Sequence, residues 1–259
     1  MATAYTQVPI INDGSYYVSD LQMTFVSTTQ ISIAKGAARD SKNLNDIILK
    51  SDLSIKTSTK GLNGIDSGVV QPTKRYALFV VGDSTGYYQT GAILSLNDEK
   101  PLLPFGYDMY RRIGWVMTNG SSQVIKFYQY GTDSTRKYYY DIADTDGSVV
   151  LSGGSETTYT KVQLSGGTNA PLIPPFPTKV FFRVEYDQDN IANNAMFQPY
   201  GSDPAAIPTA TVGFGVVSLQ YSTIFLITNA DDTGIQSIQY KVGSGDATSL
   251  IITGYEDYL

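Results

Sequence analysis

The segment 82–86 (GDSTG) matches the G-x-S-x-G pattern of a hydrolase nucleophile elbow, and it directly follows the apolar run Leu78–Val81. In such an enzyme a histidine takes the proton of the serine, but this sequence contains no histidine. No helical pattern follows the segment, and no nearby residue suggests a Ser–Lys pair. We therefore interpret 82–86 as a polar turn in which Asp83 and Ser84 bond to local backbone groups, and we predict no catalytic residue.

Acidic residues gather at three further places in the sequence: Asp141, Asp144 and Asp146 before Gly147; Asp187 and Asp189; and Asp231 and Asp232 before Gly234. Carboxylate oxygens are the ligands that calcium prefers, but none of these clusters follows the EF-hand spacing. Asp followed by Gly is also typical of tight turns, and we interpret all three clusters in that way. The prediction is therefore no metal ligand and no cofactor, with calcium binding by an acidic loop as the alternative.

The composition excludes several other kinds of site. The 259-residue chain has no cysteine, so it can hold neither a disulfide nor a thiolate metal centre. The lack of histidine also removes the commonest transition-metal ligand and the usual switch near neutral pH. A formal net charge of −6 argues against the phosphate contacts that nucleic-acid binding requires. No secretory signal or membrane-spanning apolar run is present, so we expect synthesis in a cytoplasm without membrane insertion.

The stretch 104–122 (PFGYDMYRRIGWVMTNGSS) contains the single tryptophan, Trp115. Its apolar residues lie mostly two apart, which predicts a strand with one face on a core and Thr118 on the side towards water. The dipeptide Asn119-Gly120 predicts a tight turn with positive φ, and the apolar residues of 124–127 predict a return strand. The stretch therefore reads as a hairpin.

Two arginines of this strand, Arg111 and Arg112, follow Asp108 closely in the sequence. We predict that they face water and form a surface ion pair of little energetic consequence. A charge pair that bridges two subunits is the alternative.

Tyrosine is unusually frequent, with 20 residues in the chain. Within a strand, tyrosine usually packs on a sheet, whereas on a loop it can stack on a sugar or anchor a protein interface. We favour packing or subunit contact over glycan binding for nine of them: Tyr87, Tyr88, Tyr107, Tyr110, Tyr128, Tyr130 and Tyr138 to Tyr140.

Short apolar runs separated by Gly, Asn, Asp and Ser recur every ~8–12 residues, which is typical of a β-sandwich or jelly roll. No helical segment and no fixed repeat is visible. We predict an extended docking arm at residues 1–20, with an edge strand as the alternative, and then two β-sandwich or jelly-roll-like units at 21–132 and 133–259. The proline-rich stretch 170–178 (APLIPPFPT) is predicted to be a rigid connector.

Individual elements follow from the same pattern. The segment Lys35–Asp46 is predicted to be a long polar loop, and the run from Arg75 to Val81 is apolar enough for a strand buried on both faces. In the second half we predict strands at Val180–Tyr186, Ala195–Tyr200, Val212–Tyr221, Ile224–Asn229, Ile235–Val242 and Leu250–Tyr255.

Four blocks also carry a resemblance: IAKGAARDSKNLNDIIL (33–49), LFVVGDSTGYY (78–88), LPFGYDMYRRIGWVMTNGSS (103–122) and SLIITGYEDYL (249–259). Together they resemble a family of bacteriophage virion proteins, usually described as tail-fibre, head-fibre or virion structural proteins. The similar blocks span most of the chain from residue 21 onward. The resemblance implies a homo-oligomer, most simply a trimer, that docks on other virion proteins of head or tail and is displayed outward.

We therefore expect a non-enzymatic virion structural protein, located in the fibre, the tail or collar, or the capsid surface. The alternative is a virion-borne receptor-binding protein that recognises a host surface glycan. A third hypothesis is an esterase that uses Ser84, or a depolymerase. A depolymerase needs two carboxylates across a groove, and phage enzymes of that kind are long β-helices, whereas no coil repeat occurs in this sequence.

Overall fold

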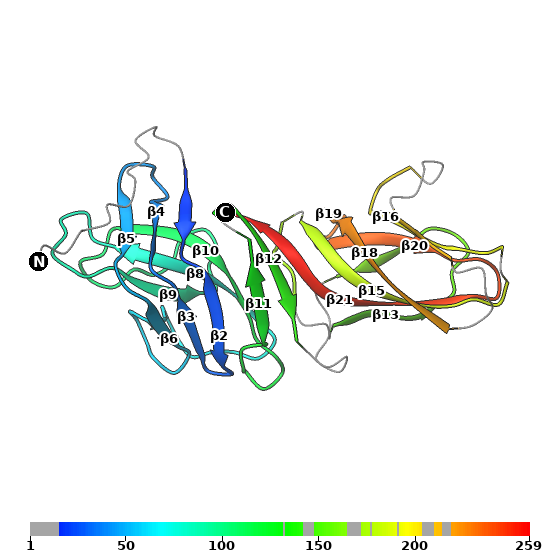
Figure 1. Cartoon of the computed structure of the whole chain (residues 1–259), viewed down its shortest axis with the longest axis horizontal. Helices are drawn as coiled ribbons and strands as arrows, with labels where there is room; N and C mark the ends of the chain where they lie inside the picture. Colours follow the sequence, from blue (N-terminus) through cyan, green and yellow to red (C-terminus); the bar gives the residue numbers. More distant parts are fainter. Residues whose placement is uncertain are drawn as a thin grey trace, which may run out of the picture.

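The computed structural model describes residues 16–131, 133–141, 148–164, 172–176, 178–190, 192–203, 210–213 and 219–259. Within these ranges the chain forms strands and no helix, which confirms the predicted all-β fold of sandwich-like units (Figure 1). The strands of the N-terminal unit are β1 (Val18–Asp20), β2 (Met23–Ser27), β3 (Gln30–Ile33), β4 (Gly36–Arg39), β5 (Asp46–Leu49), β6 (Leu53–Lys56), β7 (Gly64–Ile65), β8 (Arg75–Gly82), β9 (Gly91–Ser95) and β10 (Met109–Met117).

The C-terminal unit contains the remaining strands, which are on average longer. They are β11 (Phe127–Tyr130), β12 (Thr135–Tyr140), β13 (Val149–Gly154), β14 (Thr160–Gln163), β15 (Lys179–Asp187), β16 (Ala195–Pro199), β17 (Ala210–Val212), β18 (Leu219–Ile227), β19 (Asn229–Ala230), β20 (Gln236–Lys241) and β21 (Ala247–Tyr258).

One layer of the N-terminal unit is built from three bent strands. Their halves pair in two three-stranded sheets, of order β1-β4-β5 and β2-β3-β6, and each half of a strand is separated from the other by two or three residues. The first strand bends at Asp20 and Leu21, which both have a φ of 56°, a left-handed conformation that interrupts the ladder. The layer packs on a second sheet of order β10-β8-β9-β7.

The centre of that second sheet is β8, whose sequence RYALFVVG lacks any polar residue after its arginine. Every residue from Tyr76 to Gly82 is buried, which confirms the prediction of a strand covered on both faces. Burial of both faces explains the continuous apolar run, because neither side of the pleat meets water.

The C-terminal unit is a sandwich of a six-stranded sheet, β11-β12-β21-β15-β18 with β13 beside β21, and a five-stranded sheet, β14-β20-β16-β17 with β19 beside β20. The strand β15 shows how the sequence sets the faces. In KVFFRVEYD, Val180, Phe182 and Val184 are buried, whereas the residues between them are partly exposed. The alternation has the period of two that a half-buried strand requires.

The two units share one continuous hydrophobic core rather than being joined by a bare linker. The strand β11 lies within the first predicted unit (21–132), but it pairs with β12 and so belongs to the large sheet of the C-terminal unit. The side-chain carbonyl of its Gln129 accepts a hydrogen bond from the backbone N–H of Met23, on β2, at 2.7 Å. The residues of β11 therefore bond to both units.

Three expectations about the N-terminal unit need correction. The segment Lys35–Asp46 is not a single polar loop, because it contains β4, whose Ala37 and Ala38 are small enough to be buried between β1 and β5. Thr118 does not face water: it is fully buried, and its hydroxyl donates to the carbonyl of Gln71 at 2.8 Å. The positive φ of the following turn is found at Ser122 and not at Gly120.

The expected hairpin of 104–122 exists only at its closed end. A single antiparallel bridge joins Thr118 to Val124, after which the chain leaves. The ladder partner of β10 is β8, and that of β11 is β12. The return strand therefore belongs to the sheet of the other unit, where each of its residues from Phe127 to Tyr130 pairs with β12.

Three further predictions concern the N-terminal arm, the proline-rich stretch and the break between two late strands. Residues 1–15 of the predicted arm lie outside the described residues, while Val18–Asp20 form the edge strand β1 of the protein's own sheet. In the stretch 170–178, residues 170, 171 and 177 are likewise outside, and Leu172 and Ile173 are buried. The expected break between Tyr221 and Ile224 is absent, because β18 runs without interruption.

Candidate binding surface

The segment 82–86 forms a turn, as predicted. The carboxylate of Asp83 accepts hydrogen bonds from the backbone N–H groups of Thr85 at 2.9 Å and Tyr87 at 2.8 Å, and from the Thr85 hydroxyl. These bonds, led by that from Thr85, lower the pKa of Asp83 to about 2. The hydroxyl of Ser84 donates to Asp108 at 2.5 Å. Asp83 and Ser84 therefore both form hydrogen bonds within these loops, as expected for a structural turn.

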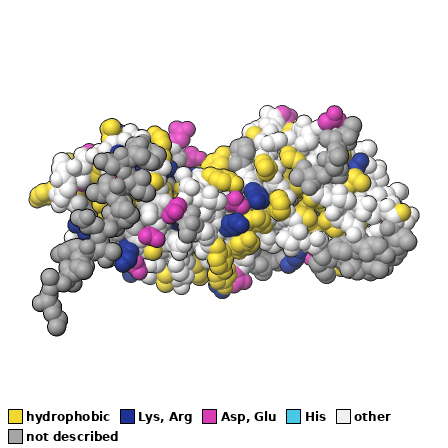
Figure 2. Space-filling view, turned by 45° about the horizontal axis from the view of Figure 1, so that its top comes forward, with side chains coloured by type: hydrophobic (Ala, Val, Ile, Leu, Met, Phe, Trp, Pro, Cys, Tyr) yellow, Lys and Arg dark blue, Asp and Glu magenta, His cyan; other side chains and the backbone are white. Residues whose placement is uncertain are grey.

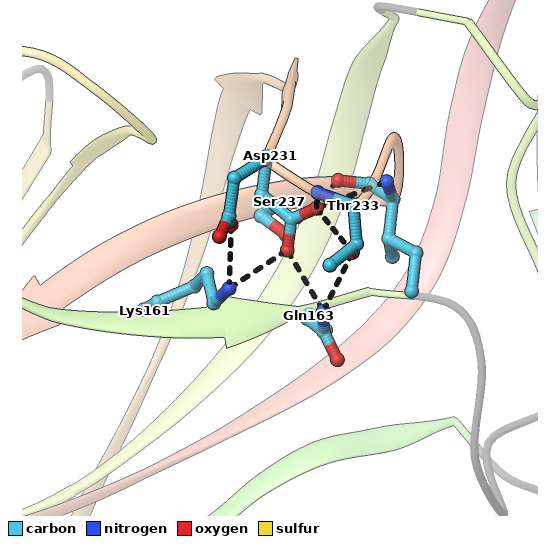
Figure 3. Close-up of polar contacts among 7 residues, drawn as sticks. Lys161, Gln163, Asp231, Thr233 and Ser237 are labelled. Atoms are coloured by element: carbon cyan, nitrogen blue, oxygen red, sulfur yellow. Dashed lines mark hydrogen bonds and ion pairs between the residues drawn. The ribbon is translucent and has the colours of Figure 1, made fainter.

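The Asp231 turn is also confirmed, and it forms a larger polar cluster (Figure 3). Asp231 accepts hydrogen bonds from the backbone N–H and hydroxyl of Thr233, at 2.9 and 2.6 Å. From β14, Gln163 donates to the same carboxylate at 2.8 Å, and Lys161 forms an ion pair with it at 3.0 Å. The Thr233 hydroxyl and Gln163 hold the pKa of Asp231 well below its ordinary range. Each contact lies within the protein, so the cluster ties the β19–β20 turn to β14.

The remaining acidic clusters are only partly described. Asp141 forms an ion pair with Lys126 at 2.5 Å, whereas Asp144 and Asp146 lie outside the described residues. Asp187 ends β15, and the backbone N–H of Asp189 donates to Asp246 at 2.8 Å. Among the residues that the structure describes, no three acidic side chains are placed to hold a metal ion.

The prediction for the two arginines was wrong. Asp108 is bonded to Ser84, and Arg112 instead reaches β21, where it forms an ion pair with Asp257 at 2.8 Å. Arg111 lies with its guanidinium 5.1 Å from the ring centre of Tyr16. Adjacent residues of a strand point to opposite faces, so Arg111 and Arg112 could not both face water, and Arg112 lies on the side that meets β21.

The C-terminal unit brings together aromatic residues that are far apart in the sequence. Residue pairing across its large sheet places Tyr128 opposite Tyr139, Tyr139 opposite Gly254, Gly254 opposite Phe181, and Phe181 opposite Phe225. One row of aromatic side chains therefore crosses β11, β12, β15 and β18, with a glycine of β21 at its centre. We call these four side chains the aromatic row.

The glycine is what makes the row continuous. A side chain at Gly254 would collide with the backbone carbonyl of Tyr138. In its absence the rings of Tyr139 and Phe181 meet over the glycine, with centres 5.2 Å apart and planes at 8°. Stacked aromatic pairs of this kind stabilise a sheet beyond the area that they bury.

A second row runs beside the first and carries charge. Pairing along the same strands aligns Tyr130, Lys137, Glu256, Lys179 and Ile227. Lys179 lies 3.6 Å from the Glu256 carboxylate and 4.5 Å from the ring centre of Phe225. The central part of this charged row thus alternates positive, negative and positive side chains next to an aromatic row.

This face of the sheet is open over much of its area. Phe225 and Ile227 are each 57% exposed, and Tyr128, Tyr130, Tyr139 and Tyr258 are also exposed. In Figure 2, hydrophobic side chains gather across the middle of the molecule with charged side chains among them. Among the described strands, β18 pairs only with β15, so its other edge has no ladder partner. An open apolar face beside an unpaired edge is a typical surface for association.

The sequence identified only half of this surface. Tyr128, Tyr130 and Tyr139 were among the tyrosines singled out, and they do lie outward, whereas Tyr138 packs inward on Tyr255 with ring centres 4.6 Å apart. Phe181 and Phe225 were missed. A usable signal exists, because adjacent apolar residues in KVFFRVEYD and TIFLI must point to opposite faces of the sheet.

Comparison with protein-family models finds no match to this chain, and comparison with curated proteins also finds none. The described residues contain no helix long and apolar enough to cross a membrane. The surface is therefore interpreted from its own chemistry.

Proposed function

We propose that this chain is a non-enzymatic structural component of a bacteriophage virion, and that it assembles with further copies of itself through the aromatic row and the charged row. The observation that carries the assembly is the aromatic row, whose side chains come from four strands and which ends at the exposed Phe225. The virion assignment rests on the resemblance of the sequence blocks 33–49, 78–88, 103–122 and 249–259 to virion structural proteins.

The exposed apolar face costs free energy in water, and self-association would remove that cost. Burying side chains such as Phe225 and Ile227 in an interface contributes about 25 cal/mol of favourable free energy for each Å² of apolar surface removed from water. The tyrosines add rigid contact area with few rotatable bonds. A protein surface that concentrates such residues on a flat sheet is thus suited to bind another protein surface.

The unpaired edge of β18 beside the aromatic row favours a second copy of this chain as the occupant. Glu256 is buried and already paired with Lys179 at 3.6 Å, so the charged row adds the exposed Lys137 at the rim of this face. In a trimer with the three faces turned towards a common axis, each copy would bury its aromatic row against the next. Such packing would also cover the unpaired edge of β18. Fibre, collar and capsid-surface positions all suit a trimer of this kind.

Sedimentation velocity and light scattering on the full chain test the assembly. We expect an oligomer at micromolar concentration, and we expect the double variant Phe225→Ser, Ile227→Ser to dissociate at least about tenfold more readily. Both side chains are exposed, so the change leaves the core intact. The matched control Val26→Ser alters an exposed aliphatic residue of the N-terminal unit and should associate as the wild type does. A wild-type monomer at this concentration contradicts self-association.

The place in a particle requires a separate measurement. Antibodies against the chain, or a reconstruction of purified particles, should locate it on head, collar or tail in several copies. If the chain is present in the infected-cell lysate but absent from the particles purified from that lysate, the virion assignment is contradicted. The self-association result would be unaffected.

A further inference from the structure

Two loops at the N-terminal unit display aromatic side chains that the aromatic row does not include. Phe105 is 94% exposed and Tyr87 is 82% exposed, the two highest values among the large apolar side chains of the described residues. Tyr88 and Tyr107 lie beside them, and we call the four residues the aromatic tip. The tip includes the tyrosines that directly follow the segment 82–86.

The aromatic tip is held in place by its own loops. The rings of Tyr88 and Tyr107 are stacked with centres 5.7 Å apart and planes at 29°, and Tyr87 meets Tyr88 edge-on at 5.0 Å. The Tyr107 hydroxyl donates to the carbonyl of Gln89 at 2.7 Å. The ring of Tyr88 occupies the space that a side chain at position 106 would need, and Gly106 has a φ of +85°.

The acidic residues of the loops complete this arrangement. Asp83 accepts hydrogen bonds from the backbone N–H groups of Tyr87 and Tyr88, at 2.8 and 3.0 Å, and so fixes the loop that carries both rings. Asp108 joins the second loop to the first by accepting from the backbone and hydroxyl of Ser84. The three tyrosine rings are therefore positioned before any ligand arrives, which lowers the entropy cost of binding.

The chemistry around the rings points to one class of ligand. Asp108 is exposed beside the tip, together with the polar side chains of Thr85 and Gln89. A carboxylate at the rim repels phosphate, sulfate and acidic sugars, but it accepts hydrogen bonds from hydroxyl groups. The aromatic faces offer a flat apolar surface of the kind on which the C–H face of a sugar ring packs. A hydroxyl-rich ring without negative charge satisfies both features.

A protein partner fits the tip less well than it fits the aromatic row. The polar residues Ser84, Thr85 and Gln89 lie on the same loop as Tyr87 and Tyr88, so the apolar area is divided. Protein interfaces place aromatic anchors within a continuous patch that excludes water. We propose that the aromatic tip is a binding site for neutral carbohydrate, in which Tyr87 and Phe105 stack on sugar rings and Asp108 accepts hydrogen bonds from sugar hydroxyls. This inference goes beyond self-association and concerns a different surface.

Binding of the full chain to an array of neutral and acidic oligosaccharides tests the proposal, followed by titration of the best neutral oligosaccharide by calorimetry. We expect binding to neutral glycans, and a loss of about tenfold or more in affinity for Tyr87→Ala and for Phe105→Ala. The matched control is Tyr16→Ala, since Tyr16 is a 58% exposed tyrosine of the same unit outside the tip. Its affinity should equal that of the wild type.

Asp108→Asn separates hydrogen bonding from stacking. The carboxamide keeps one acceptor oxygen, so neutral glycans should bind more weakly but detectably. Acidic glycans should bind with higher affinity than they do to the wild type, because the repelling carboxylate charge is gone. Neutral glycan binding that survives the double variant Tyr87→Ala, Phe105→Ala overturns the site. Binding of acidic glycans alone, binding of a protein alone, or no binding up to millimolar concentration overturns the ligand class. The oligomeric state of these variants should equal that of the wild type, so failure here is distinct from failure of the proposed assembly.

Discussion

Arg112 on β10 and Asp257 on β21 form an ion pair with a distance of 2.8 Å between the guanidinium Nη1 and the carboxylate Oδ2. It links the two units, and the Asp257 side chain has no exposed surface. The Arg112 guanidinium also lies 5.0 Å from the ring centre of Trp115, and it donates to the backbone carbonyl of Tyr258 at 3.1 Å. Burial raises the pKa of Asp257 above its ordinary value, while Arg112 opposes that rise.

Replacing Arg112 by methionine should therefore destabilise the protein strongly. The substitution keeps much of the side-chain volume but leaves the Asp257 carboxylate buried without its partner, which costs roughly 3 kcal/mol of unfolding free energy at about pH 7. Urea denaturation measures this loss. Arg111→Met is the matched control, because Arg111 is the adjacent arginine and meets Tyr16 by a cation–π contact. It should cost no more than about 1 kcal/mol. Equal losses in the two variants would contradict the role of the ion pair.

The loss in Arg112→Met should shrink as the pH falls. Without the guanidinium, burial raises the folded-state pKa of Asp257 further above the unfolded-state value. A carboxyl group with a raised folded-state pKa gains folded-state stability as the pH falls through that pKa, since the folded protein then binds the proton more tightly. Repeating the denaturation at about pH 5 should thus give a smaller difference from wild type than at about pH 7. A difference that grows on acidification would contradict this assignment.

Arg136 makes a second link between the units, at the bend of the first strand. It is fully buried, and its guanidinium donates to the backbone carbonyls of Asp20 and Leu21. Those carbonyls are free for this purpose because the left-handed conformation at the bend removes them from a regular ladder. The arginine is thereby paired with backbone dipoles, which offsets part of the cost of burying its charge.

Arg136→Met should release this bend. The carbonyl of Leu21 would be left buried and that of Asp20 partly buried without a donor, and we expect a loss of about 3 kcal/mol in unfolding free energy. Hydrogen exchange by mass spectrometry should show reduced protection of β1 and β2, with less change in β20. Lys137→Met alters the exposed neighbour on β12 and should leave the exchange of β1 and β2 as in the wild type. Unchanged protection in Arg136→Met would show that the bend does not depend on the arginine.

These two arginines illustrate what the sequence could predict. The fold class followed from strand-sized apolar runs, and β8 followed from its apolar sequence, because local patterns report local burial. The ion pair of Arg112 joins residues 145 positions apart. No local pattern encodes such a pairing, and arginine was expected at the surface because charged residues usually lie there.

The aromatic row also could not be predicted from local patterns alone. The number of tyrosines suggested that they matter, but the face of the sheet on which each one lies depends on the strand register. A shift by one residue moves every side chain of a strand to the opposite face. Tyr138 and Tyr139 are adjacent, yet one is buried and the other is exposed. The sequence around Gly254 carries no signal of its role, because that role depends on the neighbouring strands β12 and β15, and only the sheet order places them there.

Gly254→Ala should disturb the aromatic row directly. The added methyl group would collide with the carbonyl of Tyr138, so β12 and β21 must separate, at a cost of about 1–3 kcal/mol. The stacking of Tyr139 on Phe181 should weaken with it. Thermal unfolding and sedimentation should therefore show both lower stability and weaker self-association. Gly120→Ala is the matched control, because a methyl group there has nothing within 4 Å. A stable, fully associated Gly254→Ala protein would contradict the role given to the glycine.

Asp231→Ala tests the polar cluster of the β19–β20 turn. The carboxylate accepts from the Thr233 hydroxyl at 2.6 Å and pairs with Lys161 at 3.0 Å, so its removal should lower the denaturation midpoint more than Asp232→Ala does. Asp232 is the matched control, because its side chain is 74% exposed and contacts the same lysine. The Thr233 hydroxyl and Gln163 depress the folded-state pKa of Asp231 below the unfolded-state value.

The depressed pKa sets the pH dependence of this effect. The stabilisation by Asp231 is fully present above the unfolded-state pKa, and it is lost as the pH falls from there towards the folded-state pKa. The difference in midpoint between the wild type and Asp231→Ala should thus be constant near neutral pH and should decrease below about pH 4. Denaturation curves recorded from neutral to acidic pH measure it. A difference that stays constant throughout would show that the carboxylate charge does not stabilise the turn, because the neutral acid would then serve equally well.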